Sequence, residues 1–434
     1  MAEERLAVYL DGSRVGALHQ SAQGRLSFGY DDAYRNRAAS VPLSLSMPKH
    51  AATYPNKVVL AFISGLLPDS EPALQRLGRK YGVSANNPFA LLRHIGRDAA
   101  GAVQVLPETA TCHDAANRQG DIDWLSDEAI DQTLVDLARS PETWDPGRNA
   151  GRWSLAGAQS KIALFRSPEG RWGVPQDSTP TTHILKPSMP NYQGHHLNEH
   201  LCLRAAQLCG LPAADTELLT TDRYEVLISR RYDRVRDGDG RWRRLHQEDL
   251  CQALSVPPSK KYQSDGGPGV PEIGRLLTTS GLQSSRQENL RRMFDYLVYN
   301  VAIGATDAHA KNFSILLSSR DVRLAPLYDV ASMVPYDQES HLQSAMKIGN
   351  TWRMAAVANT DWAAVGKHFG LTADDAANRA AALRARIPAA FAQVASEAGV
   401  PEPLRPRAQW IADLVTAHVE GRRDRWGRVD VPKV

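Results

Sequence analysis

The sequence predicts an α+β protein of two lobes, in which a β-rich N-terminal lobe is followed by a mainly helical C-terminal lobe. Three observations lead to this fold class. Residues 5–18 alternate apolar and polar positions around an Asp11-Gly12 turn, as paired antiparallel strands do. A second group of short strands separated by turn residues begins at Ser154. From Ser285 onward, apolar residues recur at helical spacing.

The N-terminal part, residues 1–107, is expected to combine a small sheet with short helices. Residues 26–30 can add a third strand to the hairpin, and residues 56–105 have helical character in several short pieces. One of these pieces follows Asn87-Pro88 and stops near Gly96. Residues 101–107 then predict the strand that closes this subdomain.

Residues 108–153 are interpreted as a connector. Residues 108–123 are polar and show no period, whereas residues 125–137 have the pattern of a capped helix. Residues 140–153 are rich in Pro, Gly, Asp and Trp, which is typical of a loop.

The remaining chain is divided into a sheet-containing part, residues 154–250, and a mainly helical part, residues 251–434. In the second part Ser285 and Glu288 have the spacing of a capping box. The apolar stripe that follows runs to Gly304, a natural helix end. Alanine-rich helices are expected at residues 373–397 and 406–419.

Composition and charge indicate an ordinary globular protein. The chain has 434 residues, 42% hydrophobic and 23% charged, with a net charge of +3 that does not point to a nucleic-acid binder. The sequence starts with acidic residues in place of the basic ones of a signal peptide, and no apolar run reaches the ~18 residues of a membrane span. The four cysteines form no C-x-x-C pair. We therefore expect a cytoplasmic protein without a disulfide scaffold or membrane contact.

The chemistry is concentrated just after Gly304, in Asp307-Ala-His309-Ala-Lys311-Asn312-Phe313. Protein kinases carry an Asp and an Asn five positions apart in their catalytic loop; the Asp accepts the proton of the substrate hydroxyl and the Asn holds Mg²⁺. Asp307 and Asn312 have this spacing. The alternative interpretation of the same residues is a polar loop with a capping Asp and a buried His.

The residues that follow favour the kinase interpretation. Residues 313–317 and 322–324 predict a short hairpin, whose ends lie close together. Asp329, just beyond the hairpin, is therefore expected near Asn312. A carboxylate beside that amide is what Mg²⁺ bound to ATP phosphates requires, because Mg²⁺ takes oxygen ligands.

The upstream residues can supply the nucleotide contacts. The small-residue loop Ala156-Gly157-Ala158-Gln159-Ser160-Lys161, between two expected strands, lets backbone amides approach phosphates, although an ordinary hairpin explains it equally well. Lys186 ends an apolar strand, where kinases place the lysine that holds the α- and β-phosphates. Glu199 lies at the start of the next helix and can pair with Lys186. Tyr232 follows a further strand and can pack on adenine.

These strings resemble the HipA family, the serine/threonine-kinase toxins of bacterial toxin–antitoxin modules. The resemblance covers nearly the whole chain and is carried by several motifs, which are Gly96-Arg-Asp-Ala-Ala-Gly-Ala-Val-Gln104, Ser154-Leu-Ala-Gly-Ala-Gln-Ser-Lys161, Pro180-Thr-Thr-His-Ile-Leu-Lys186, Asn198-Glu199, Gln247-Glu-Asp-Leu-Cys-Gln252, Lys261-Tyr-Gln-Ser-Asp-Gly-Gly-Pro-Gly269 and Ile303-Gly-Ala-Thr-Asp-Ala-His-Ala-Lys-Asn-Phe313.

The resemblance implies a two-lobe protein-kinase-like fold with ATP and Mg²⁺ between the lobes. It implies that Asp307 is the base and that the nucleotide and Mg²⁺ site is lined by His309, Lys311, Asn312, Tyr328 and Asp329. Further ATP contacts are implied for residues 156–161, Lys186, Arg230, Arg231 and Tyr232. Arg230 departs from the pattern, since a well-known member has Glu there.

The resemblance also implies regulation and partners. Ser154 occupies the place of an autophosphorylated serine whose modification silences the enzyme, and Ser160 offers a second acceptor. A phosphate on this loop would repel the triphosphate that it binds. The implied partners are a small HipB-like DNA-binding antitoxin, through which operator DNA is contacted indirectly, and a protein substrate, an aminoacyl-tRNA synthetase such as glutamyl-tRNA synthetase, whose modification stops translation and growth.

Two rival functions remain open at this point. The H-x-x-E-H pattern of zinc proteases is formed by His196, Glu199 and His200. However, Pro190 and Gly194 place His196 on the first helical turn or in a loop. The second rival is a pseudokinase that only binds its antitoxin or DNA. Residues 421–434 are basic, with five Lys or Arg against two Asp, although a solvated tail explains them as well.

Overall fold

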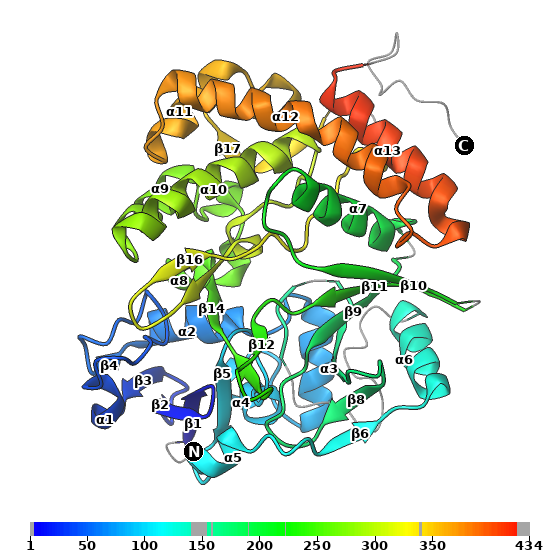
Figure 1. The fold of residues 1–434 in the computed structure, drawn as a ribbon. Helices are drawn as coiled ribbons and strands as arrows, with labels where there is room; N and C mark the ends of the chain where they lie inside the picture. Colours follow the sequence, from blue (N-terminus) through cyan, green and yellow to red (C-terminus); the bar gives the residue numbers. More distant parts are fainter. Residues whose placement is uncertain are drawn as a thin grey trace. The chain divides into compact units, whose positions relative to one another are not determined.

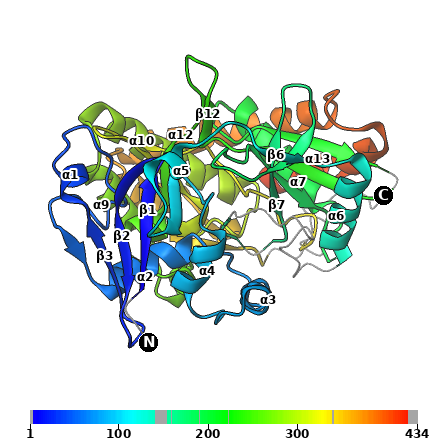
Figure 2. The same ribbon diagram turned by 90° about the horizontal axis from the view of Figure 1, so that it is seen from below.

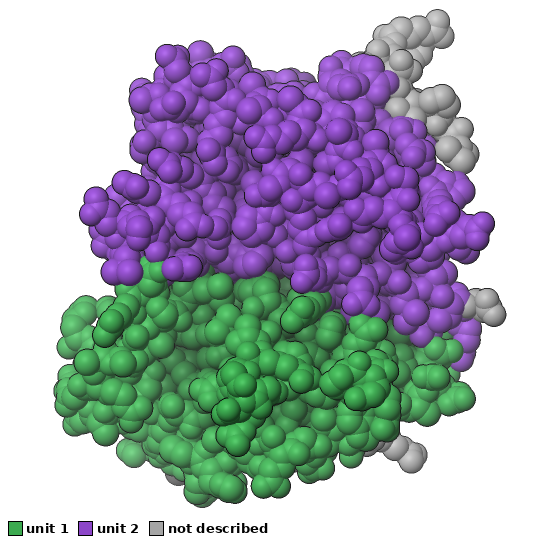
Figure 3. Space-filling view, in the orientation of Figure 1, with its two compact units in different colours: residues 1–187, 230–259, 315–321 green, residues 188–229, 260–314, 322–434 purple. Residues whose placement is uncertain are grey.

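The computed structural model describes residues 4–139, 154–157, 159–189, 191–221, 223–337 and 341–422. The chain divides into two compact units, which Figure 3 colours separately. Unit 1 comprises Met1–Pro187, Arg230–Ser259 and Ile315–Asp321, and unit 2 comprises Ser188–Ser229, Lys260–Ser314 and Val322–Val434. The four-part division at residues 107, 153 and 250 stays a prediction. The predicted loop at residues 140–153 lies outside the described residues.

Unit 1 begins with an antiparallel sheet whose strand order is β4-β3-β2-β1-β5. Figure 2 shows β1, β2 and β3 side by side. The expected turn is present at Asp11 and Gly12, whose φ angles of 48° and 86° lie in the left-handed region that such a tight turn requires. The strands are β1 (Glu4–Leu10), β2 (Ser13–Gln20), β3 (Leu26–Tyr30), β4 (Thr53–Tyr54) and β5 (Val103–Pro107).

Short helices pack their apolar faces on this sheet and complete the first core. Asn87 caps the helix that was expected after Asn87-Pro88, because its side chain accepts a 3.1 Å hydrogen bond from the Ala90 amide. Phe28, Phe62 and Phe89 are among the fully buried side chains of this core. The helices are α1 (Asp32–Arg35), α2 (Asn56–Gly65), α3 (Glu71–Tyr81) and α4 (Pro88–Ile95).

Residues 108–123, which show no period in the sequence, are not irregular throughout: they contain α5 (Cys112–Ala116) and the start of β6 (Ile122–Trp124). Thr111 and Asp114 form a capping box that stabilises the short helix. Strand β6 exists because it pairs with β8, and such a distant partner leaves no local period in the sequence. The helix expected at residues 125–137 is present as α6 (Asp127–Arg139).

The second sheet of unit 1 contains β7 (Ile162–Arg166), β8 (Trp172–Pro175) and β9 (His183–Pro187), which with β6 run in the order β9-β7-β8-β6. Residues 154–156 were expected to form a strand before the small-residue loop, but they have no regular structure, and the amide and hydroxyl of Ser154 bond instead to the carbonyls of Asp98 and Leu66. Unit 1 also holds β12 (Arg234–Arg236), β13 (Trp242–Arg244), β14 (His246–Asp249) and α8 (Leu250–Ala253).

Unit 2 is mainly helical. Helix α12 packs against α7, α10, α11 and α13 (Figure 1). The helices are α7 (His195–Leu208), α9 (Val270–Thr279), α10 (Gln283–Ala302), α11 (Asn359–His368), α12 (Ala373–Ala395) and α13 (Arg405–Val419). The strands are β10 (Thr216–Thr220), β11 (Glu225–Arg230), β16 (Val322–Leu324), β17 (Gln343–Ile348) and β18 (Thr351–Arg353), and β15 (Ser314–Leu317) starts in this unit.

Helix α10 carries the chain to the site and confirms the predicted apolar stripe, because Met293, Leu297 and Val298 are buried. Its start was predicted wrongly. The N-cap residue is Leu282 and no side chain caps the helix, so Ser285 lies inside the first turn, where its side chain is buried. Gly304 ends the helix with φ 71°, and a Cβ there would lie 2.7 Å from a methyl carbon of Val334.

No helix among the described residues is long and apolar enough to cross a membrane. The four cysteines are free thiols, and Cys202 and Cys209 are buried as small apolar residues.

Candidate active site

The loop after α10 has a defined conformation. The Ala305 amide bonds to the Asn300 carbonyl at 2.8 Å, and the Met333 amide bonds to the Gly304 carbonyl at 2.9 Å. Farther on, the Asn312 amide bonds to the His309 carbonyl at 2.9 Å, closing a 3₁₀ turn over Ala310–Asn312. The candidate catalytic residues therefore lie on a braced turn at the end of a buried helix.

Asp307 and Asn312 are in direct contact. The Asn312 Nδ2 donates to the Asp307 carbonyl oxygen at 2.8 Å and lies 3.4 Å from its carboxylate Oδ2. The Asp307 side chain is 60% exposed, so its carboxylate is accessible to a substrate hydroxyl. Because the Asn312 amide nitrogen faces Asp307, its Oδ1 oxygen faces the other way and can bind a cation.

The segment before Asp329 is held against the Asn312 loop. The Ala325 amide bonds to the Ser314 carbonyl at 2.8 Å, where the expected hairpin closes. Tyr328 then donates its hydroxyl to the Lys311 carbonyl at 3.0 Å and lies 2.6 Å from the Ser314 hydroxyl. Asp329 follows with φ 56°, a left-handed conformation that costs a non-glycine residue about 1 kcal/mol or more and is concentrated at functional sites.

His309 and Lys311 are buried in the loop. The His309 Nε2 lies 3.6 Å from Asp307 Oδ1. The hydrogen bonds of Tyr328 show that this residue braces the loop. The contact of His309, Lys311 and Tyr328 with ATP remains a prediction.

The donors fit Mg²⁺ rather than zinc. Asn312 Oδ1 and the Asp329 carboxylate are hard oxygen ligands, and Mg²⁺ in nucleotide sites typically uses one or two such protein ligands together with phosphates and water. Among the described residues no group of three or more His, Cys, Asp and Glu side chains could hold a metal ion.

Hydrogen bonds hold the small-residue loop of unit 1 in place at both of its ends. The Ser154 amide donates to the Asp98 carbonyl at 2.9 Å, and its buried hydroxyl donates to the Leu66 carbonyl at 2.7 Å. The Asp69 amide bonds to the Gly157 carbonyl at 3.1 Å. Lys161 is buried and donates from Nζ to the Ala156 carbonyl at 2.7 Å, across the loop.

The backbone at Gly157 favours glycine. Its φ of 110° lies outside the range that other residues adopt readily, and a Cβ there would force the Lys161 side chain to shift. Gln159 and Ser160 lie beside it, with Ser160 buried. Ala158 lies outside the described residues.

Lys186 and Glu199 are both buried, Lys186 on β9 in unit 1 and Glu199 on α7 in unit 2. Burial of a charged side chain requires polar partners, so neither residue is a solvated strand or helix end. Their mutual pairing remains a prediction.

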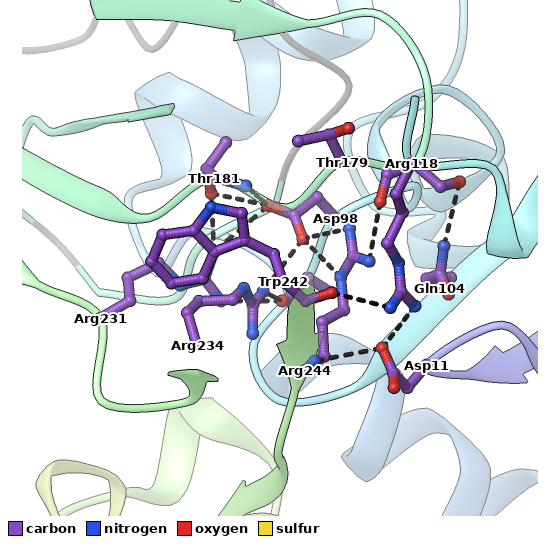
Figure 4. A network of polar contacts seen from close by, with 12 residues as sticks. Asp11, Asp98, Gln104, Arg118, Thr179, Thr181, Arg231, Arg234, Trp242 and Arg244 are labelled. Atoms are coloured by element: carbon purple, nitrogen blue, oxygen red, sulfur yellow. Dashed lines mark hydrogen bonds and ion pairs between the residues drawn. The ribbon is translucent and has the colours of Figure 1, made fainter. Parts of the chain in front are cut away.

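Arg231 belongs to a buried network inside unit 1, shown in Figure 4. Its guanidinium donates to both carboxylate oxygens of Asp233, at 3.1 and 3.0 Å, to Thr181 at 2.9 Å and to the Ala99 carbonyl at 3.0 Å. This side chain therefore has a structural role. Tyr232 donates its hydroxyl to Gln247, and Arg230 is exposed.

Asp98 is the acceptor at the centre of the same network. Its Oδ1 accepts 2.9 Å bonds from Arg234 and Arg244, and its Oδ2 accepts from Thr181 at 2.6 Å and from Arg231 at 3.3 Å (Figure 4). Burial by itself raises the pKa of Asp98, but the nearby charges of the three arginines outweigh burial and hold this pKa well below its ordinary range. The sequence analysis quoted Asp98 only as part of a motif and missed this role.

The zinc-protease alternative is not supported by the histidine contacts. His196 lies on the first turn of α7 with Nε2 3.3 Å from a carboxylate oxygen of Glu225, and His200 bonds to the Thr216 hydroxyl at 2.9 Å. Burial lowers the pKa of both histidines to about 4. The two imidazoles thus face different side chains of unit 2.

Two protein-family models match this chain. The model of the HipA-like C-terminal domain matches residues 153–391, and that of the HipA N-terminal domain matches residues 6–106. The chain belongs to the HipA family. The matched regions include the small-residue loop, the Asp307–Asn312 loop and Asp329.

Two named relatives are similar to this chain over most of its length. The chain is 37% identical over 84% of its length to "Putative kinase Y4mE" of Sinorhizobium fredii, of which it covers 86%. It is 30% identical over 81% of its length to the serine/threonine-protein kinase toxin HipA of Shewanella oneidensis, of which it covers 81%.

A solved structure shares the fold. A chain in the solved complex of Shewanella oneidensis HipA, HipB and operator DNA superposes with a TM-score of 0.80 at 24% identity, and the match covers 96% of each chain. The predicted fold class, α+β with the two-lobe kinase-like fold of HipA, is confirmed.

Proposed function

We propose that this HipA-family chain is a Mg²⁺- and ATP-dependent serine/threonine protein kinase. The single observation that carries the proposal is the contact between an exposed Asp307 and Asn312 on a braced loop, to which Tyr328, the residue before Asp329, is hydrogen-bonded. A polar surface loop has no need of such bracing. The accessible carboxylate favours a working enzyme over a pseudokinase.

Each residue has a defined task in the proposed reaction. The substrate serine gives its hydroxyl proton to the Asp307 carboxylate, and its oxygen forms a bond to the γ-phosphorus of ATP. The bond from that phosphorus to the β,γ-bridging oxygen breaks, and its electron pair leaves with ADP. Asn312 Oδ1 and the Asp329 carboxylate would hold Mg²⁺, which would neutralise charge on the phosphates when bound.

Unit 1 supplies the proposed phosphate contacts. Lys161 and Lys186 are buried cations, and the backbone of residues 156–160 offers amides to phosphate oxygens. Tyr232 is proposed to contact adenine. The Arg231 guanidinium is fully engaged in hydrogen bonds inside unit 1. Any contact of residues 230–231 with the nucleotide is therefore proposed for their other atoms and not for that guanidinium.

The biological partners follow from the relatives. One is a toxin by name, and the solved complex contains HipB and operator DNA. We therefore infer a HipB-like antitoxin for this chain, with DNA contacted through it. The proposed substrate is an aminoacyl-tRNA synthetase, such as glutamyl-tRNA synthetase, whose phosphorylation stops translation and arrests growth.

Ser154 is proposed as the autophosphorylation site that switches the kinase off. Its hydroxyl is buried and bonds to the Leu66 carbonyl, so a phosphate cannot occupy the docked position: it would place a dianion against a carbonyl oxygen at a buried position. Modification therefore requires the loop to leave its docked conformation, and the modified loop cannot return.

A Ser154→Asp variant is expected to bind ATP about ten-fold or more weakly than wild type, because the introduced carboxylate displaces the loop and repels phosphates. Isothermal titration with Mg²⁺ and a non-hydrolysable ATP analogue measures this affinity. Ser154→Ala, which removes the acceptor without adding charge, is the matched control and is expected to stay within about three-fold of wild type. An unchanged affinity in Ser154→Asp contradicts the proposed switch.

The kinase assignment is tested with γ-labelled ATP. Purified protein incubated with Mg²⁺ is expected to transfer the label to serine, on itself at residue 154 and on a protein of a cell lysate, and peptide mapping identifies the sites. Absence of any transfer from protein that binds ATP contradicts the proposal and favours a pseudokinase.

A further inference from the structure

The segment from Lys260 to Gly269 has no role in the function proposed above, yet hydrogen bonds and close contacts restrict its backbone conformation. The Asp265 and Gly267 amides both bond to the Tyr262 carbonyl, at 3.1 and 3.0 Å. Gly266 has φ 83°, and a Cβ on Gly267 would overlap the carbonyl oxygens of Lys260 and Tyr262. The turn is therefore tight, and only glycines permit it.

Gln263 fixes this turn to the rest of unit 2. Its side-chain oxygen accepts a 2.7 Å bond from the Lys347 amide of β17. A Cβ on Gly269 would overlap the same side chain, so Gln263 packs directly on the backbone at the start of α9. This anchored turn fixes the direction in which the Tyr262 side chain projects from the backbone.

Tyr262 reaches the catalytic base. Its hydroxyl donates to Asp307 Oδ1, and its ring stands edge-on to the His309 imidazole, with centroids 4.8 Å apart and an interplanar angle of 86°. The other contacts of the Asp307 carboxylate are long, 3.4 Å to Asn312 Nδ2 and 3.6 Å to His309 Nε2. At 60% exposure, little packing holds this carboxylate.

We propose that Tyr262 is a positioning residue for phosphoryl transfer, holding Asp307 Oδ1 so that Oδ2 faces the substrate hydroxyl. This inference rests on the kinase function proposed above. A carboxylate rotates easily about its terminal torsion, and a charge-assisted hydrogen bond from a rigid donor removes that freedom. Misplacement of a reacting group by about 1 Å can cost about 100-fold in rate, so one fixed oxygen has a kinetic consequence.

The test is Tyr262→Phe, which keeps the ring against His309 and removes only the donor. Its kcat for peptide or self-phosphorylation is expected to fall about ten-fold or more, while KM for ATP and the affinity for Mg²⁺-ATP stay within about three-fold of wild type. Tyr81→Phe is the matched control. Tyr81 lies on α3 in unit 1 with its ring stacked on His94, and its variant is expected to retain wild-type kcat.

Two results overturn the inference. One is a Tyr262→Phe enzyme whose kcat is within two-fold of wild type. The other is a loss of rate that comes with an equal loss of Mg²⁺-ATP affinity or a lowered melting temperature, which assigns Tyr262 a purely structural role. Failure of the kinase proposal itself looks different, because wild-type protein then transfers no phosphate in the same assay.

Discussion

An Asp307→Asn variant is expected to lose phosphoryl transfer by about 1,000-fold or more while still binding Mg²⁺-ATP. Asparagine keeps the size of the side chain and can still accept the Tyr262 bond, but it cannot accept the proton of a substrate hydroxyl. Since the Asp307 side chain is 60% exposed and packs little, the substitution is not expected to disturb the fold. Initial rates with γ-labelled ATP, paired with nucleotide titration, separate lost chemistry from lost binding.

The matched control is Asp374→Asn, an exposed carboxylate in the first turn of α12. It is expected to leave the transfer rate within about two-fold of wild type. A transfer rate in Asp307→Asn equal to that of this control would remove Asp307 from the mechanism, whatever else the loop does.

The second large effect concerns stability. Asp98→Ala is expected to destabilise unit 1 by about 3–5 kcal/mol, because it leaves Arg231, Arg234 and Arg244 buried without their shared carboxylate. The side chains of these arginines are at most 2% exposed, so water cannot replace the lost partner. Chemical denaturation monitored by tryptophan fluorescence measures the free energy of unfolding.

Asp239→Ala, in an exposed turn of the same unit, is the control and is expected to change stability by less than about 0.5 kcal/mol. Asp98→Asn keeps the shape and removes the charge, so it tests whether charge or packing dominates. An Asp98→Ala protein as stable as the Asp239→Ala protein would contradict the structural importance of the network.

The depressed pKa of Asp98 gives this stability a pH dependence. A carboxyl whose folded pKa lies below its unfolded value stabilises the fold at pH above the unfolded pKa, which is about 3.9 for Asp, and this stabilisation is lost as pH falls toward the folded pKa. Wild-type protein is therefore expected to lose stability below about pH 4 more steeply than Asp98→Asn.

Much of the fold was predictable because its determinants are local. The Asp11-Gly12 turn, the helix after Asn87 that stops near Gly96 and the apolar stripe of α10 depend on residues within a few positions of one another, and each was confirmed. Asp307 and Asn312, paired in the sequence by their five-residue spacing, are in direct contact, while their catalytic roles stay predictions.

The features that sequence analysis missed depend on distant partners. Strand β6 forms by pairing with β8, and Asp98 meets arginines more than 130 positions away. Tyr262 reaches Asp307 across 45 positions. The only local indications of the last two were a conspicuous acid in Gly96-Arg-Asp98 and the glycine cluster after Tyr262. The predicted helix start at Ser285 was wrong because α10 begins earlier, at Gln283.

The most direct test of the proposed centre is metal binding to Asn312 and Asp329. Mn²⁺ prefers the same oxygen ligands as Mg²⁺, and electron paramagnetic resonance measures its free concentration in the presence of an ATP analogue. Asn312→Ala and Asp329→Asn are each expected to weaken Mn²⁺ binding about ten-fold or more, with Asp374→Asn unchanged. Wild-type Mn²⁺ affinity in both site variants would show that these two residues do not share a metal ion.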